Sequence, residues 1–366
     1  MRTAFFKTFF KALSIAVSCT FIFACSSTKP ASESVAEPAP NSSAEIATQE
    51  GAQNTTADHS AATTEVSMSA APSSENFGDL FIGAWVGGPE EIPQPTVANV
   101  EAFEKLQNRH LDVINHFVLW QYNDWAWTKP YAEMAKSRGS IMMITWMPQP
   151  YTAQDILDGK TDAYLDDFAK GVKEFGAEIW LRPLHESNGD WYTWGTGKDS
   201  VNNAEAKVAA AFRHIVERFR AQGATNAKWI WTTNAGSSAG ATLTGSYPGD
   251  DYVDYTSIDG YNWGTAQTWS HWQSFSEVFK PAYDALSAYD KPMFLAEFSC
   301  SEHGGSKGEW FKNMFEVLPK EFPKIKGLVI FSQSKSYEAD WGVDTSNEAL
   351  EAWKAGIAAF PEKSQK

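Results

Sequence analysis

From residue 77 to the C-terminal region, short runs of β-branched and aromatic residues alternate with longer amphipathic stretches. This alternation is typical of repeated βα units around a parallel sheet. Eight runs have the length and composition of strands, at residues 81–87, 113–120, 141–147, 179–183, 228–232, 255–261, 293–298 and 327–331. Helical spacing of apolar residues fills most of the gaps, at residues 97–107, 130–137, 162–175, 204–221, 272–288, 308–322 and 347–360. The pattern predicts a single α/β domain over residues 76–366, a (β/α)8 TIM barrel.

Side chains able to bind or act on a ligand follow almost every one of these runs. In a (β/α)8 barrel the active site lies at the C-terminal ends of the strands, so we expect these side chains to converge. They are Trp85, Trp120, Trp146, His185, Glu186, Asn234, Tyr261, Trp263, Glu297 and the segment 332–341. Aromatic residues make up 14% of the chain, which accounts for some of these positions but not for their concentration at strand ends.

Two of these strand ends carry a carboxylate. Glu186 lies within Arg182-Pro-Leu-His-Glu-Ser-Asn-Gly-Asp-Trp191, and Glu297 follows the run Pro-Met-Phe-Leu-Ala. Two carboxyl groups that converge from different strands can divide the roles of acid and nucleophile, as the hydrolysis of a glycosidic bond requires. The surrounding Trp and Tyr residues supply flat faces on which sugar rings can stack. These residues indicate a glycoside hydrolase.

Four ordered motifs carry a resemblance to a known family. They are Arg182-Pro-Leu-His-Glu-x-Asn-Gly-x-Trp191, Asp259-Gly-Tyr261, Pro292-x-x-x-Ala296-Glu297 and Asp340-Trp341. Together they resemble glycoside hydrolase family 26, whose members are retaining β-glycanases on a (β/α)8 barrel. The resemblance runs from about residue 77 to residue 360, and so covers the whole predicted barrel.

The resemblance implies a different role for each carboxylate. Glu186 would be the general acid/base and Glu297 the nucleophile. Burial against Trp191, beside a negative partner, would favour a protonated Glu186, and a hydrogen bond from the Tyr261 hydroxyl would favour an ionised Glu297. His185 would contact the sugar or orient Glu297.

Other residues are expected to support the site. Arg182 is expected to lie behind the carboxylates rather than on the sugar, and Asn234 ends the fifth predicted strand. Sugar platforms are expected at Trp146, Trp263 and Trp341, and each ring is equally compatible with a place in the core. No metal or other cofactor is expected. Zinc-dependent hydrolysis in particular is excluded, because Gly189 stands where the second histidine of a zinc-binding helix would be.

The resemblance leaves the sugar open, because the family includes β-mannanases, mixed-linkage β-1,3-1,4-glucanases and β-1,3-xylanases. Four segments look closer to the glucanases: Trp191-Tyr-x-Trp194, Lys228-Trp-x-Trp231, Ile258-Asp-Gly-Tyr-Asn-Trp-Gly264 and Glu302-x-Gly-Gly-x-Lys307. Ser187 departs from the Met usual in the family. We expect an endo-β-1,3-1,4-glucanase, with an endo-β-1,4-mannanase as the alternative. A hypothesis from another class is a catalytically inactive carbohydrate-binding lipoprotein. Loss of one carboxylate would mark such a protein, and both are present.

The N-terminus has the features of a bacterial secretory signal. Arg2, Lys7 and Lys11 precede an apolar stretch that is too short to span a membrane. The stretch ends Phe-Ala-Cys25-Ser-Ser, which resembles the lipobox of bacterial lipoproteins; an ordinary signal peptide with an incidental cysteine is the alternative. We expect a lipoprotein signal over residues 1–24, lipidation of Cys25 and an address in the cell envelope, by analogy at the outer membrane. Without lipidation the protein would be secreted.

The segment between signal and barrel, residues 25–75, is dominated by Ala, Ser, Thr, Glu and Pro. Such a composition cannot bury enough apolar surface to fold, so we expect a disordered linker. Without the signal, 27 Lys and Arg oppose 45 Asp and Glu, a formal net charge of −18. This charge argues against nucleic acid and anionic polysaccharides as ligands. We expect a monomer that acts on a neutral polysaccharide and contacts the membrane through its lipid alone.

Overall fold

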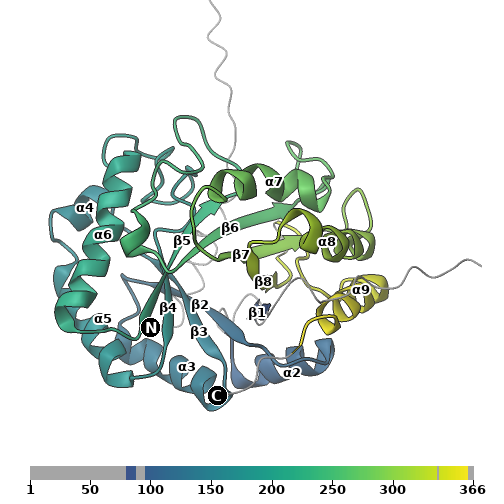
Figure 1. Cartoon of the computed structure of the whole chain (residues 1–366), viewed down its shortest axis with the longest axis horizontal. Coiled ribbons are helices and arrows are strands. Elements are labelled where there is room, and N and C mark those ends of the chain that lie inside the picture. Colours follow the sequence, from purple (N-terminus) through teal and green to yellow (C-terminus); the bar gives the residue numbers. More distant parts are fainter. Residues whose placement is uncertain (1–79, 88–94, 336–337, 362–366) are drawn as a thin grey trace, which may run out of the picture. The chain divides into compact units, whose positions relative to one another are not determined.

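The computed structural model describes residues 80–87, 95–335 and 338–361. Eight parallel strands pair in chain order and close into a barrel, surrounded by helices in Figure 1. The strands are β1 (Phe81–Val86), β2 (Val113–Leu119), β3 (Ile141–Met147), β4 (Ile179–Pro183), β5 (Ala227–Asn234), β6 (Tyr255–Asn262), β7 (Met293–Cys300) and β8 (Ile325–Ser332). The predicted (β/α)8 barrel is confirmed.

The helices of the described residues lie in the connections between strands, except for α9, which follows the last strand. They are α2 (Val97–Gln107), α3 (Trp125–Ser137), α4 (Ala153–Leu157), α5 (Asp162–Phe175), α6 (Glu205–Gln222), the 3₁₀ turn η2 (Asp250–Tyr252), α7 (Phe275–Leu286), α8 (Lys307–Glu321) and α9 (Asn347–Ala358). Helix α3 begins five residues before its predicted start at Pro130, because the Asp124 side chain caps it by accepting the Trp127 backbone N–H at 2.8 Å. Helix α4 was not predicted, since five residues are too few for a helical period to be recognised.

The interior of the barrel changes from apolar to polar along the strands. One buried cluster contains Val113, Met143, Trp180, Ile230, Phe294, Ala296 and Val329. Two residues further along β2, β3 and β4 stand Asn115, Thr145 and Arg182, all fully buried. Positions two apart on a strand share a face, so these polar side chains form the next interior layer. Thr145 Oγ1 links them, because it accepts from Arg182 Nη2 at 2.7 Å and donates to Asn115 Oδ1 at 2.9 Å.

The predicted signal peptide, Cys25 and the linker over residues 25–75 lie outside the described residues. Within the described part of the chain, no helix is both long and apolar enough to cross a membrane.

Candidate active site

Glu297 enters the barrel because strand β7 carries a β-bulge. Ala296 belongs to the interior apolar cluster, so regular alternation would turn its neighbour Glu297 outward. Two consecutive residues of β6, Ile258 and Asp259, pair with Leu295 and Glu297 of β7. Ala296 is therefore the extra residue of the bulge and is skipped in the pairing. A bulge of this kind redirects a side chain, and here it brings the carboxylate above the polar interior layer.

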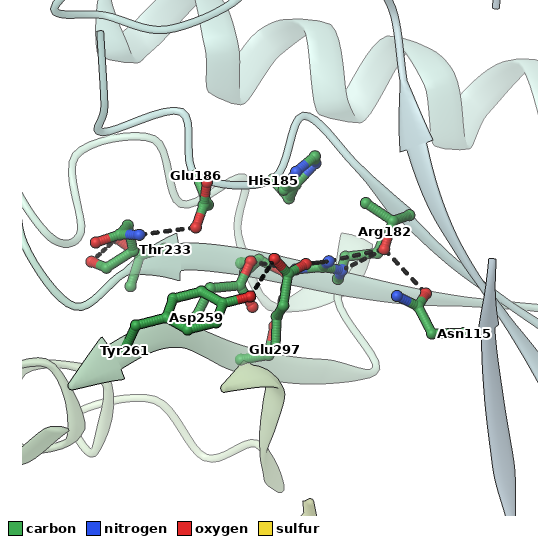
Figure 2. Close-up of polar contacts among 12 residues, drawn as sticks. Asn115, Arg182, His185, Glu186, Thr233, Asp259, Tyr261 and Glu297 are labelled. Atoms are coloured by element: carbon green, nitrogen blue, oxygen red, sulfur yellow. Dashed lines mark hydrogen bonds and ion pairs between the residues drawn. The ribbon is translucent and has the colours of Figure 1, made fainter. Parts of the chain in front are cut away.

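Both oxygens of the Glu297 carboxylate accept a hydrogen bond. The Tyr261 hydroxyl donates to Oε1 at 2.7 Å, and Arg182 Nη2 donates to Oε2 at 2.9 Å (Figure 2). The predicted contact between Tyr261 and Glu297 is therefore present. The two donors fix the orientation of the carboxylate and complement its negative charge.

Arg182 lies beneath the carboxylates and has no exposed surface. Its guanidinium also forms an ion pair with Asp259, which is equally buried on β6. Asp259 belongs to the motifs quoted from the sequence but was not predicted as a site residue. Because Arg182 cannot reach a bound sugar without displacing other groups, its place is to hold Glu297 and Asp259.

Glu186 follows β4 on a turn whose backbone is left-handed at two residues other than glycine. The φ angle is 54° at Leu184 and 52° at Glu186. Such conformations cost about 1–3 kcal/mol each and persist where the surroundings enforce them. The Glu186 backbone N–H helps to hold the turn, since it donates to the carbonyl of Thr232 on the neighbouring strand at 3.3 Å.

The Glu186 carboxyl group is buried and accepts two hydrogen bonds, from Trp191 Nε1 at 2.8 Å and from Asn234 Nδ2 at 2.7 Å. Burial, with the negative charge of Glu297 as the second cause, raises the pKa of Glu186 to about 7. The hydrogen bonds from Asn234 and Trp191 act in the opposite direction and limit this rise in pKa. Figure 2 shows Glu186 and Glu297 on opposite sides of the same space.

Asn188 supports the site through hydrogen bonds, and its motif was quoted from the sequence without a role for this residue. Its side-chain amide donates to the carbonyls of Asn234 and Gly236, at 2.9 and 3.0 Å, and to the Ser237 hydroxyl at 3.0 Å. Its oxygen accepts the Asn234 backbone N–H at 2.9 Å. Asn188 thereby fixes the end of β5, from which Asn234 reaches Glu186.

His185 lies beside Glu186 with 1% of its surface exposed, and its ring packs 4.8 Å from that of Tyr192. Among the described residues neither ring nitrogen has a hydrogen-bond partner, so His185 does not orient Glu297 through a hydrogen bond. Burial lowers the pKa of His185 well below its usual value, and the charge of Arg182 adds to this effect. Contact with a sugar, the other predicted role of His185, stays a prediction.

The three predicted sugar platforms have different surroundings. Trp146 is fully buried, packs 4.6 Å from Phe168 and donates to the Tyr164 hydroxyl at 3.0 Å, so its assignment as a platform is wrong. Trp146 follows Thr145, whose side chain faces the barrel interior, so the Trp146 side chain faces the surrounding helices and not the site. Trp341 is 1% exposed and supports the ring of Tyr261 from 4.8 Å, which leaves it no free face. Trp263 is only partly buried and can still meet a sugar.

The segment Glu302-x-Gly-Gly-x-Lys307 holds the loop that carries Trp341. Lys307 is fully buried, and its Nζ donates to the carbonyls of Asp340 at 3.0 Å and Gly342 at 2.7 Å, one on each side of Trp341. Glu302 Oε1 accepts from two hydroxyl groups further along the same loop, each at 2.9 Å. The motif therefore acts on the site through Trp341 and Tyr261.

Three carboxyl groups, those of Glu186, Glu297 and Asp259, surround the single guanidinium of Arg182. One cation cannot balance three ionised carboxylates, and burial raises the pKa of two of the three groups, that of Glu186 to about 7 and that of Asp259 well above its usual value. In the described part of the chain, no three His, Cys, Asp or Glu side chains are grouped as metal ligands would be. The arrangement places Glu186, whose pKa is raised, across from Glu297, which accepts hydrogen bonds from Arg182 and Tyr261.

Comparison with known proteins agrees with this geometry. Residues 124–297, which include both carboxylates, match the sequence model of glycosyl hydrolase family 26. The chain contains a glycoside hydrolase family 26 domain. It is 47% identical over 297 residues to endoglucanase H of Acetivibrio thermocellus, an alignment that covers 80% of this chain and 32% of that protein.

More distant similarity extends to mannanases. The chain is 25% identical over 205 residues to a mannan endo-1,4-β-mannosidase of Bacillus subtilis, covering 52% of each protein. It therefore spans about a third of the length of endoglucanase H and about half of the mannosidase. The catalytic domain of an endo-β-1,4-mannanase from Bacillus sp. JAMB-750 has a TM-score of 0.59 at 15% identity, covering 77% of this chain and 86% of that one. This structural likeness supports the fold alone.

Proposed function

We propose that this protein hydrolyses β-glycosidic bonds of a neutral β-glycan with retention of configuration. Glu297 is the nucleophile and Glu186 the general acid/base. The observation that carries the proposal is the difference between the two carboxyl groups. Glu297 is held by an arginine and a tyrosine hydroxyl, whereas burial raises the pKa of Glu186 to about 7. Such a difference divides the two catalytic roles.

The reaction takes two displacements. Glu297 attacks the anomeric carbon while Glu186 gives its proton to the leaving oxygen, and a glycosyl-enzyme ester forms. The charge of Glu297 falls as the ester forms, so Glu186 can then remain ionised and take a proton from the incoming water. Water attacks the anomeric carbon from the face that the first product left, and Glu297 departs as a carboxylate. Two inversions give a product of retained configuration.

We propose that the substrate is mixed-linkage β-1,3-1,4-glucan and that the enzyme cleaves internal bonds of this polysaccharide. The support is the 47% identity to a protein named endoglucanase, against 25% to a mannan endo-1,4-β-mannosidase. Glu302 and Lys307, part of a segment that looked closer to the glucanases, hold the loop of Trp341 beside the site. β-1,4-Mannan is the alternative substrate.

A panel of polysaccharides tests this assignment. Barley β-glucan, galactomannan, glucomannan, xylan and β-1,3-xylan are compared by kcat/KM, and the products are sized. We expect the highest kcat/KM on barley β-glucan, with mid-sized products early in the reaction. Glucose and mannose differ in the orientation of the 2-hydroxyl, which a hydrogen-bonding site can read sharply. A clear preference for mannan would overturn the glucanase assignment but keep the hydrolase mechanism.

The raised pKa of Glu186 predicts the alkaline limb of the pH profile. The first displacement needs protonated Glu186, so kcat/KM should fall as the pH rises above about 7. Trp191→Phe removes an N–H that stabilises the ionised form, so its alkaline limb should move to higher pH. The measurement is kcat/KM from pH 4 to 10 for both proteins. If the alkaline limb falls at the same pH in both proteins, the group that titrates there is not Glu186.

We also propose that the protein is anchored through a lipid on Cys25. The support is the lipobox-like sequence that ends the apolar stretch of the signal. Cys25→Ser should release the protein from membranes, because one cysteine carries the whole anchor. Fractionation of cells that express each form checks this, and a variant that still pellets with membranes in high salt would contradict the lipid anchor.

A further inference from the structure

A row of aromatic rings leads from the nucleophile to the protein surface. Tyr261, which donates to Glu297, lies 6.2 Å from the ring of Trp263, and Trp263 lies 5.3 Å from the ring of Trp269. Trp341 packs edge-on against Trp263, with 4.9 Å between the ring centroids, and is the buried member of the row. The exposure of the rings rises along the row, from the buried Trp341 to Trp269 with 53% of its surface exposed.

The exposure of Trp269 is unusual in this protein. Among the described residues, the large apolar side chains that are strongly exposed are Val97, Tyr122, Val201 and Trp269. Single exposed apolar residues are common and need no explanation. The ring of Trp269, however, packs against that of Trp263, which in turn lies beside Tyr261 at the catalytic site. An exposed indole face at this place is a surface on which a sugar ring can stack.

The turn that carries Trp269 is held from both sides. The Gln267 N–H donates to the Ser270 hydroxyl and the Ser270 N–H to the Gln267 carbonyl, each at 3.2 Å, while Gln267 Nε2 donates to the Glu338 carbonyl at 3.4 Å. Earlier in the loop, Gly264 has a φ of 53°, and a Cβ there would lie 1.8 Å from the His303 carbonyl oxygen. A ring on such a fixed turn binds a ligand without much loss of conformational freedom.

We propose that Trp269, together with Trp263, forms a distal subsite that stacks a hexose unit of the substrate chain beyond the units at the cleaved bond. The inference rests on the proposed β-glycanase function. The apolar C–H face of a hexose lies on the indole, and its hydroxyl groups remain in water. No charge is required of the ligand at this position, which suits a neutral glycan.

This subsite affects long substrates more than short ones. A glycan chain can occupy the catalytic site and Trp269 together, whereas an aryl glycoside of two sugars is too short to use the whole row. Loss of one stacked ring should lower kcat/KM on the polymer about three- to tenfold. The effect should appear mainly as a higher KM, because a distant contact contributes equally to the bound substrate and the transition state.

The experiment compares the ratio of polymer to aryl-glycoside kcat/KM in four proteins: the wild type, Trp269→Ala, Trp269→Phe and the control Tyr252→Ala. Tyr252 is a partly buried aromatic residue in η2, which precedes β6 and so lies at the opposite end of that strand from Tyr261. The ratio should fall about three- to tenfold in Trp269→Ala, recover in part in Trp269→Phe and keep its wild-type value in Tyr252→Ala. An unchanged ratio in Trp269→Ala, or an equal fall in Tyr252→Ala, would overturn the proposal.

Affinity electrophoresis separates failure of the subsite from failure of the proposed function. Each protein is run through gels that contain barley β-glucan or galactomannan, where binding slows migration whether or not cleavage occurs. Retardation that Trp269→Ala weakens supports the subsite even if the wild type hydrolyses neither polymer. Retardation equal in wild type and Trp269→Ala, or absent from both gels, overturns the subsite even if the wild type is an active hydrolase.

Discussion

Glu297→Ala should lower the turnover of β-glucan by several orders of magnitude and abolish the glycosyl-enzyme intermediate. In the described part of the chain, the third carboxyl group beside Arg182, that of Asp259, is fully buried and cannot take over the attack on the anomeric carbon. The variant should still fold, since the lost contacts are those of Tyr261 and Arg182, and Arg182 keeps its partner Asp259. Steady-state rates and mass spectrometry with a slow fluorinated glycoside measure the two effects.

Glu351→Ala is the matched control for loss of a carboxylate. Glu351 lies on α9 with 69% of its side chain exposed, and its partner Lys354 is on the same helix. This variant should keep wild-type turnover and still accumulate the covalent intermediate. Substantial β-glucan turnover by Glu297→Ala, or a labelled adduct on another residue, would contradict the assignment of the nucleophile.

The barrel could be predicted from the sequence because its strands are buried on both faces. Such strands appear as short continuous apolar runs, and the amphipathic helices between them show a different period. The ends of β4 and β7 were therefore placed closely enough to bring Glu186 and Glu297 to the same end of the barrel. The hydrogen bond from Tyr261 to Glu297, by contrast, was expected from the resemblance to the family and not from the placement of the strands.

Side-chain direction within a strand could not be predicted in the same way. Period-two alternation places Ala296 inside the barrel and Glu297 outside, and only the bulge in β7 reverses this for the carboxylate. Trp146 lies near the end of β3, much as other site residues lie near the ends of their strands, but it faces the surrounding helices and is fully buried. A strand end fixes the height of a residue along the barrel, and the local register decides which face it occupies.

The hydrogen bonds of Asn188 show a second limit. The residue stands two positions after Glu186, yet its amide contacts the end of β5, which is 46 residues away in the chain. Asparagine in a turn normally bonds to its own backbone, and nothing in its neighbourhood identifies a distant partner. Its role is visible only once β4 and β5 lie side by side.

Glu186→Ala should behave differently from Glu297→Ala because Glu186 acts in both displacements. Polysaccharide turnover should fall by several orders of magnitude, since the leaving sugar oxygen needs a proton. An aryl glycoside with a good leaving group needs little protonation, so the first displacement should survive and produce a burst of phenol. The glycosyl-enzyme should then accumulate, because no base activates the incoming water. Stopped-flow measurement of phenol release checks this, and a variant without a burst would count against the acid/base role.

Azide distinguishes the two carboxylates by the stereochemistry of its product. It is a small anion that needs no base, so it should attack the intermediate of Glu186→Ala, restore turnover of the aryl glycoside and yield a β-glycosyl azide. In Glu297→Ala, azide would take the place of the missing carboxylate and give the α-glycosyl azide by a single inversion. The expected difference follows from the positions of Glu186 after β4 and Glu297 on β7, on opposite sides of the same space. Anomeric proton couplings in the NMR spectra of the two products measure it, and an exchange of the two azides would reverse both role assignments.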